Sequence, residues 1–149
     1  MTADRAPAAD AVLHGVSVCV FRGDEVLMIE RAKAPGIGLW APVGGGIEPG
    51  ETAEAAALRE VAEETAVEIR LLGRVGTREI VPPAEMGSPW ALIRLEVFAA
   101  RWLSGEPVAG SDAGDARFVA LAAVEALPLI GGVLPWIGAA RRLFDGQEP

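Results

Sequence analysis

Three glutamates close together in the chain have the residue type and spacing to hold a divalent cation. Glu60, Glu63 and Glu64 are three and four residues apart, so on an α-helix their carboxylates share one face. Carboxylates crowded in this way repel one another, and water or a bound cation relieves the repulsion. Magnesium takes oxygen ligands and keeps waters that phosphate oxygens can replace. The spacing favours metal-assisted chemistry at a phosphate, although a solvated acidic helix face fits the same three residues.

A glycine-rich segment precedes the glutamates at a short distance. Gly44, Gly45 and Gly46 are followed by Glu51, which stands eight residues before Arg59. Because glycine has no side chain, the backbone there can approach an ion or a phosphate closely. A purely solvated acidic helix does not explain this glycine segment.

The helix that must carry the glutamates is predicted over residues 52–65. Thr52 is a good N-cap, and Glu54 falls in the first turn, where the helix dipole favours a negative charge. Three apolar residues at helical spacing are expected to pack inward: Ala57, Leu58 and Val61.

Alternating apolar residues predict strands on both sides of this helix. The expected strands are 13–21, 26–29, 69–75, 77–81, 92–100 and 118–120, and further helices are expected at 121–127 and 132–144. The first two strands form a hairpin. Residues 34–51 are rich in glycine and proline and are expected to form a loop. Strands interspersed with helices predict an α/β fold, a sandwich around a mixed sheet.

Length and charge bound the organisation and the partners. A chain of 149 residues predicts one domain, which we place at residues 13–145 after a flexible lead-in at 1–12. The formal net charge of −8 argues against binding to a nucleic acid polymer, which needs a basic face. An anionic partner is therefore expected to be small and accompanied by metal.

The remaining composition predicts a cytoplasmic protein without a membrane segment. Cys19 is the single cysteine, so no disulfide framework is expected. The apolar stretch at 126–140 contains Pro128 and Pro135 and is shorter than a spanning helix. We expect it to cover the core or to bury itself in a homodimer, and the sequence leaves this choice open.

The spacing of the charged residues resembles the signature of the Nudix hydrolase family, G-x5-E-x7-R-E-U-x-E-E-x-G-U, where U is a bulky aliphatic residue. The matching positions are Gly45, Glu51, Arg59, Glu60, Val61, Glu63, Glu64 and Val67. The one departure is Ala66, where the family has glycine. A glycine there is expected to end the helix in a left-handed conformation, which costs alanine on the order of 1 kcal/mol.

The resemblance implies a Nudix-type α/β/α sandwich and hydrolysis of a nucleoside diphosphate linked to another group. It implies that Glu60, Glu63, Glu64 and the carbonyl of Gly45 bind Mg²⁺, with Mn²⁺ as an alternative. Glu51 is expected to fix the ligand geometry from behind. Arg59 is counted among the residues that take part in catalysis, together with Glu63 and Glu64, and is expected to act by orienting the glutamates.

A further acidic residue from a later loop acts as ligand or base in many members of this family. We expect Asp112 in this role, with Glu106 and Asp115 as alternatives. Trp40 is expected to line the substrate pocket by stacking, although a tryptophan at the end of a strand also fits a core position. His14, the single histidine, is given no catalytic role.

The expected substrate is ADP-ribose or a similar nucleotide sugar. Pro82 and Pro83 lie where a proline is associated with ADP-ribose pyrophosphatases, although prolines also end strands. The absence of tyrosine removes the residue that marks members acting on dinucleoside polyphosphates. The alternatives are a housecleaning nucleoside triphosphate pyrophosphatase and a non-catalytic nucleotide sensor.

Overall fold

A computed structural model describes residues 11–33, 36–86 and 88–147. The predicted lead-in at 1–12 falls almost entirely outside these residues. The elements in chain order are β1 (Val12–Arg22), β2 (Glu25–Arg31), β3 (Trp40–Gly46), α1 (Ala53–Thr65), β4 (Glu68–Ile80), η1 (Ala84–Met86), β5 (Leu92–Ser104), β6 (Ala113–Ala120), η2 (Leu121–Ala126) and α2 (Val133–Gln147).

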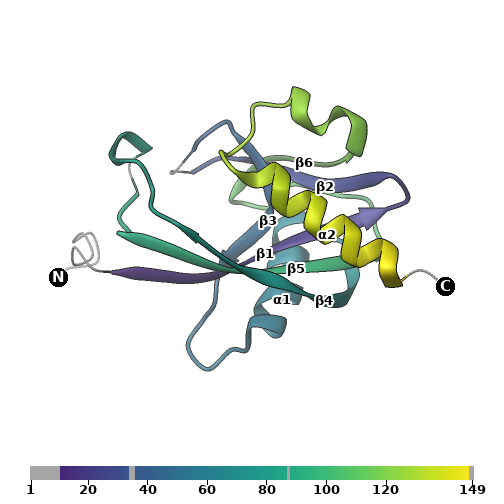
Figure 1. Cartoon of the computed structure of the whole chain (residues 1–149), viewed down its shortest axis with the longest axis horizontal. Helices are drawn as coiled ribbons and strands as arrows, with labels where there is room; N and C mark the ends of the chain where they lie inside the picture. The colour runs from purple at the N-terminus through teal and green to yellow at the C-terminus, as the bar shows by residue number, and fades with distance from the viewer. Residues whose placement is uncertain (1–10, 34–35, 87, 148–149) are drawn as a thin grey trace.

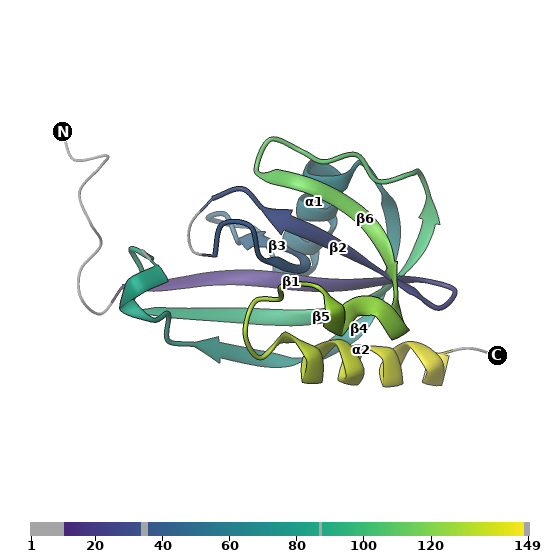
Figure 2. The same cartoon turned by 90° about the horizontal axis from the view of Figure 1, so that it is seen from above.

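The strands form one mixed sheet in the order β4-β5-β1-β3-β2-β6. Strands β1 and β5 are parallel, and the other neighbouring pairs are antiparallel. Helices α1 and α2 cover opposite faces of the sheet (Figures 1 and 2). The predicted α/β/α sandwich with a mixed sheet is confirmed.

Each helix packs on its own apolar layer of the sheet. The layer under α1 includes Val18, Val43 and Phe98, and the layer under α2 includes Phe21 and Met28. Because successive residues of a strand face opposite sides, the apolar side chains of β1 supply both layers in turn. Both faces of the sheet are thereby covered by a helix, so a ligand site is expected at the ends of the strands.

Strand β3 corrects the prediction of a structureless loop over residues 34–51. Residues 40–42 pair with β2, whereas residues 43–46 pair with β1. A side-chain carbon at Gly44 would overlap the backbone carbonyl of Val16, so the close approach of β1 and β3 requires glycine there. Glycine and proline are depleted in strands, which is why the sequence pattern hides this central strand.

Other boundaries differ from the prediction in detail. The two strands expected at 69–75 and 77–81 are one strand, β4, whose register against β5 shifts at Leu71/Gly73 and at Arg74/Gly76. Bulges of this kind break the period of two on which the prediction rests. Strand β6 begins at Ala113, earlier than expected, and the segment expected as a helix at 121–127 is the 3₁₀ helix η2.

The apolar C-terminal segment covers the sheet. Val133, Ile137, Ala140 and Phe144 of α2 are buried in the layer beneath the helix, and Leu134 is exposed. No helix within the described part of the chain is long and apolar enough to cross a membrane.

Candidate active site

Helix α1 begins and ends as its sequence predicts. The side chain of Thr52 accepts a hydrogen bond from the backbone N–H of Ala55 at 3.1 Å, which satisfies one of the free donors of the first turn. The helix ends at Thr65, and Ala66 follows in the left-handed region with φ 61° and ψ 21°. The expectation of a left-handed residue at this position is confirmed, with alanine in place of the usual glycine.

Replacing Ala66 with glycine is expected to raise the free energy of unfolding by about 0.5–1 kcal/mol. The left-handed conformation costs alanine about 1–2 kcal/mol, and the greater freedom of glycine in the unfolded chain offsets part of the gain. Ala66 is exposed, so no packing is lost. Urea unfolding measures the change, with the mid-helix Ala62→Gly as a matched control expected to destabilise by about 1 kcal/mol. Equal destabilisation by both glycines would contradict the account.

The inward face of α1 includes two of the predicted metal ligands. Glu60 is 9% exposed and Glu64 is 7% exposed, and they lie among the buried Ala57 and Val61. Leu58, which was expected to pack inward, is 46% exposed. It lies about 100° around the helix from Ala57, and Glu60 and Glu64 take the inward place instead.

Arg59 holds three glutamates and one backbone carbonyl together. Its Nε and Nη2 bind both oxygens of Glu51, at 2.7 and 2.9 Å, and Nη2 also donates to the carbonyl of Gly46 at 2.9 Å. Its Nη1 contacts Glu60 at 3.0 Å and Glu63 at 3.1 Å. The expected role of Arg59 in orienting the glutamates therefore has a geometric basis.

Glu51 ties the glycine segment to α1. Besides Arg59, its Oε1 accepts the backbone N–H of Glu48 at 2.9 Å. These hydrogen bonds, first of all the one from Arg59, lower the pKa of Glu51 to about 2. Glu51 therefore stays ionised across the neutral range and acts as a fixed anchor behind the other glutamates.

Burial raises the pKa of both Glu60 and Glu64 above the ordinary value of a glutamate. For Glu64 the nearby carboxylates of Asp112 and Glu63 raise the pKa further. One oxygen of Glu64, Oε1, is buried without a hydrogen-bond partner. A buried acceptor without a donor is costly, and a ligand that supplies positive charge at this point would relieve the cost.

The β5–β6 loop brings Asp112 to α1. The backbone N–H groups of Val108 and Gly110 donate to the carbonyls of Thr65 and Glu64, at 2.9 and 2.8 Å, and so satisfy acceptors at the end of the helix. A side-chain carbon at Gly110 would overlap the carbonyl of Glu63, so glycine is needed for this contact. Asp112 then pairs with Lys33 at 2.5 Å.

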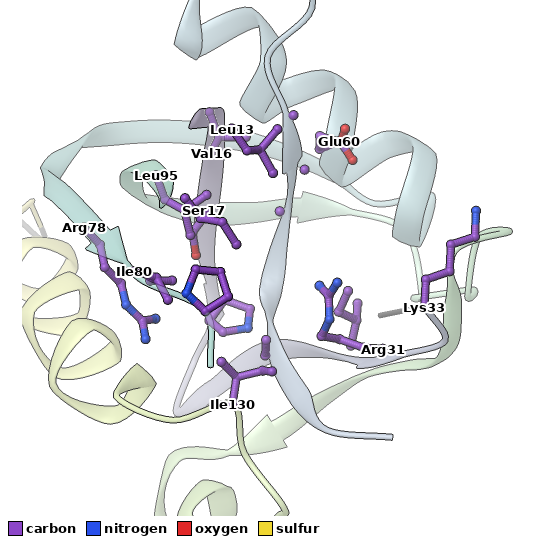
Figure 3. A pocket seen from close by; sticks show the side chains of 18 of the residues that line it. Leu13, Val16, Ser17, Arg31, Lys33, Glu60, Arg78, Ile80, Leu95 and Ile130 are labelled. Atoms are coloured by element: carbon purple, nitrogen blue, oxygen red, sulfur yellow. The ribbon is translucent and has the colours of Figure 1, made fainter. Parts of the chain in front are cut away.

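A cavity of about 430 Å³ connects these groups with the α2 side of the sheet. Its acidic end is formed by Glu60, Glu64, Asp112, Arg31 and Lys33. Its apolar end, on the other side of the crossing strand, includes Ile80, Leu95 and Ile130 together with Arg78. In Figure 3, Glu60, Arg31 and Lys33 lie on one side of the strand that crosses the cavity, and Arg78, Ile80 and Leu95 lie on the other. The cavity could therefore hold an anionic group of a ligand beside Arg31 and Lys33, and an apolar group of the same ligand at the apolar end.

Several sequence-predicted residues stand away from this cavity. Trp40 is 5% exposed and belongs to the apolar layer under α2, and Arg117 covers its ring at 4.7 Å from the centroid. Trp40 therefore occupies the core position that the sequence left as the alternative, outside the lining of the cavity. Glu106 pairs with Arg22, and Asp115 pairs with Arg117; of the three acids considered, Asp112 lines the cavity.

Four cavity residues were missed by sequence reasoning: Arg31, Lys33, Arg78 and Trp90. Burial lowers the pKa of Arg31, and the charge of Glu64 opposes this effect. Isolated cations such as Arg31, Lys33 and Arg78 carry no spacing signal, so only the fold shows that they line one cavity. Trp90 precedes β5 in the same way that Trp40 opens β3, and the sequence does not separate these two tryptophans.

His14, which was given no catalytic role, is exposed.

The donor set suits a divalent cation, although the side chains are not gathered into a closed site. Across residues 11–33, 36–86 and 88–147, no three His, Cys, Asp or Glu side chains are placed to hold a metal ion. Arg59 and Lys33 bind several of the carboxylates instead. The buried oxygen of Glu64 that lacks a hydrogen-bond partner fits a cation. Any side-chain carbon at Gly45 would overlap the carboxyl group of Glu60, so glycine lets the backbone lie directly against this second expected ligand.

The profile of the NUDIX domain matches residues 13–137, which is most of the chain. The chain belongs to the Nudix hydrolase family. The match includes the whole signature from Gly45 to Val67, so Nudix membership predicted from these spacings is confirmed.

Curated relatives include two named hydrolases. The NAD-capped RNA hydrolase NudC of Pseudomonas aeruginosa (strain LESB58) is 34% identical over 130 residues, which cover 86% of this chain and 41% of that protein. The putative 8-oxo-dGTP diphosphatase of Bacillus subtilis (strain 168) is 40% identical over 52 residues, covering 35% of this chain and 33% of that protein. This Nudix chain spans about two fifths or less of the length of these relatives.

Solved Nudix structures share the fold. The MutT protein of Methanosarcina mazei Go1 has a TM-score of 0.76 at 16% identity, covering 95% of this chain and all of that one. The Nudix domain of Shewanella oneidensis NrtR, solved with ADP ribose, has a TM-score of 0.70 at 24% identity, covering 95% of this chain and 92% of that one. At these identities the likeness concerns the architecture.

Proposed function

We propose that this chain is a divalent-metal-dependent hydrolase that cleaves the diphosphate linkage of a nucleoside diphosphate joined to another group. The observation that carries the proposal is the acidic end of the cavity, where Glu60, Glu64 and Asp112 meet the cations Arg31 and Lys33. Family membership supports this reaction class. A cation held there, Mg²⁺ in the first instance and Mn²⁺ as the alternative, would neutralise the diphosphate and make water a better nucleophile near neutral pH.

The residues of the chain have separate roles in this proposal. Glu60, Glu63 and Glu64, with the carbonyl of Gly45, hold the cation. Glu64 offers the oxygen that is buried without a partner.

The supporting residues set the geometry and move the proton. Arg59 and Glu51 fix the positions of the ligands through the hydrogen bonds described above. Asp112 takes the proton from the attacking water, while Lys33 and Arg31 bind phosphate oxygens.

The substrate class that we favour is a nucleotide sugar such as ADP-ribose. Pro82 and Pro83, whose place in the sequence is associated with ADP-ribose pyrophosphatases, line the cavity. Their position is consistent with contact to such a substrate. The second candidate, a nucleoside triphosphate pyrophosphatase, is supported by the similarity of 52 residues to a putative 8-oxo-dGTP diphosphatase. The protein is expected to act in the cytoplasm, and we leave its oligomeric state open.

A panel of nucleotides tests this proposal. The purified chain is incubated with ADP-ribose, sugar nucleotides, dinucleotides and nucleoside triphosphates, and the products are separated by ion-exchange chromatography. A nucleotide sugar should yield a nucleoside monophosphate and a sugar phosphate, whereas a triphosphate should yield a monophosphate and pyrophosphate. If the folded protein binds nucleotide and cleaves nothing, the chain is a sensor and the proposal fails.

A further inference from the structure

Arg78 is a half-buried cation without a carboxylate partner among residues 11–33, 36–86 and 88–147. Its Nη2 donates to the backbone carbonyl of Gly131 at 2.5 Å, and burial lowers the pKa of its guanidinium. A side-chain carbon at Gly132, which has a φ of 79°, would come within 3.0 Å of the same nitrogen. The turn before α2 thus fixes the guanidinium, and most of its five N–H donors stay available to a ligand.

The surroundings of Arg78 select the kind of ligand. Ile80, Leu95 and Ile130 give this end of the cavity apolar walls. Ser17 also lines the cavity on this side of β3. The acids of the lining, Glu60, Glu64 and Asp112, belong to the acidic end, where Asp112 pairs with Lys33. Figure 3 shows Arg78 beside Ile80, on the far side of the crossing strand from Glu60.

A flat aromatic ring with hydrogen-bond acceptors suits this end better than a phosphate does. A phosphate here would be desolvated against apolar walls and met by a single guanidinium, which is unfavourable. A ring instead buries its faces against apolar side chains and turns its acceptor edge to the donors of Arg78. Under the proposed function, the phosphates are bound by Arg31 and Lys33, which line the acidic end.

We propose that Arg78 binds the edge of the substrate's nucleobase and gives the enzyme a preference for guanine over adenine. Guanine presents two acceptors, O6 and N7, that match the fork of an arginine, whereas adenine presents the donor N6 beside N7. This inference rests on the proposed function, since it concerns the base of the nucleotide that is cleaved. Within the nucleotide sugars proposed above, it replaces ADP-ribose as the first expectation with a guanosine diphosphate sugar.

The test compares GDP-glucose with ADP-glucose, which differ only in the base. The wild-type chain should show a kcat/KM about tenfold or more higher for GDP-glucose. Arg78→Gln should reduce that ratio by about tenfold or invert it, because glutamine matches the N6 and N7 of adenine. Arg78→Lys keeps the charge but loses the fork, so it should also lower the ratio. Arg70→Gln, an exposed arginine of the same strand, serves as the control and should leave the ratio unchanged.

The outcomes separate this inference from the proposed function. The inference that Arg78 selects guanine is overturned if the wild-type kcat/KM is equal for the two substrates or favours ADP-glucose. It is also overturned if Arg78→Gln loses kcat/KM equally on both. If the wild type cleaves neither substrate, the nucleotide panel described above decides the proposed function, and calorimetric binding of GDP and ADP still tests the inference. Tighter binding of GDP supports it, and equal binding overturns it. This comparison uses the wild type alone, so it holds even if Arg78→Gln fails to fold.

Discussion

Replacing Glu64 with glutamine is expected to lower metal-dependent turnover by about 10³-fold while leaving the fold at least as stable as the wild type. Glutamine has the same shape but lacks the negative charge that a divalent cation needs. Burial raises the pKa of Glu64, so the ionised form weakens the metal-free fold above the ordinary pKa of a glutamate. Removing that charge removes the desolvation cost of the buried carboxylate at neutral pH. Turnover should therefore fall while the free energy of unfolding stays the same or rises.

Initial rates at saturating Mg²⁺ and urea unfolding in EDTA measure these two effects. Glu125→Gln, at an exposed position of η2, is the control and should change neither. Glu63→Gln should also lose turnover. Because it gives up the ion pair of 3.1 Å with Arg59, it should gain no stability. Turnover of Glu64→Gln within tenfold of the wild type would refute its role as a ligand.

Replacing Arg59 with lysine is expected to lower kcat about 10²-fold and the free energy of unfolding by about 1–2 kcal/mol. Lysine keeps the positive charge but cannot bind both oxygens of Glu51 while also reaching Glu60 and Glu63. The glutamates then lose their fixed geometry, and a misplacement of this kind is costly in a metal site.

Steady-state kinetics and denaturant unfolding of Arg59→Lys test this expectation. Arg70→Lys, an exchange at an exposed site, is the matched control. If Arg59 acted through charge alone, Arg59→Lys would keep nearly full activity, and the clamp would be incidental. A loss confined to stability, with kcat unchanged, would likewise show that the hydrogen bonds do not position the catalytic groups.

The sequence predicted the parts of the site whose information is local. The spacing of Glu60, Glu63 and Glu64 on a capped helix needs no tertiary contact to be recognised, and Ala66 adopts the left-handed conformation that its place in the signature implies. Asp112 was chosen from its distance to a later strand, and the fold brings it into the cavity with two of these glutamates.

The parts that sequence reasoning missed depend on pairing and on the faces of strands. Strand β3 changes partner between Pro42 and Val43, so neither neighbour imposes a simple alternation on its sequence. The places of Trp40 and Trp90 also depend on tertiary pairing. Trp40 is buried where the segment at 128–130 pairs with the start of β3, whereas Trp90 lines the cavity. Only the register decides which side chain faces a ligand.

Removal and restoration of the metal tests the central claim most directly. The chain is treated with EDTA, dialysed into metal-free buffer, and assayed on its best nucleotide substrate before and after Mg²⁺ is added. We predict that hydrolysis falls to background after EDTA and returns with Mg²⁺ in the wild type but not in Glu64→Gln. Hydrolysis that persists without metal, or that Mg²⁺ restores equally in both proteins, would contradict the account.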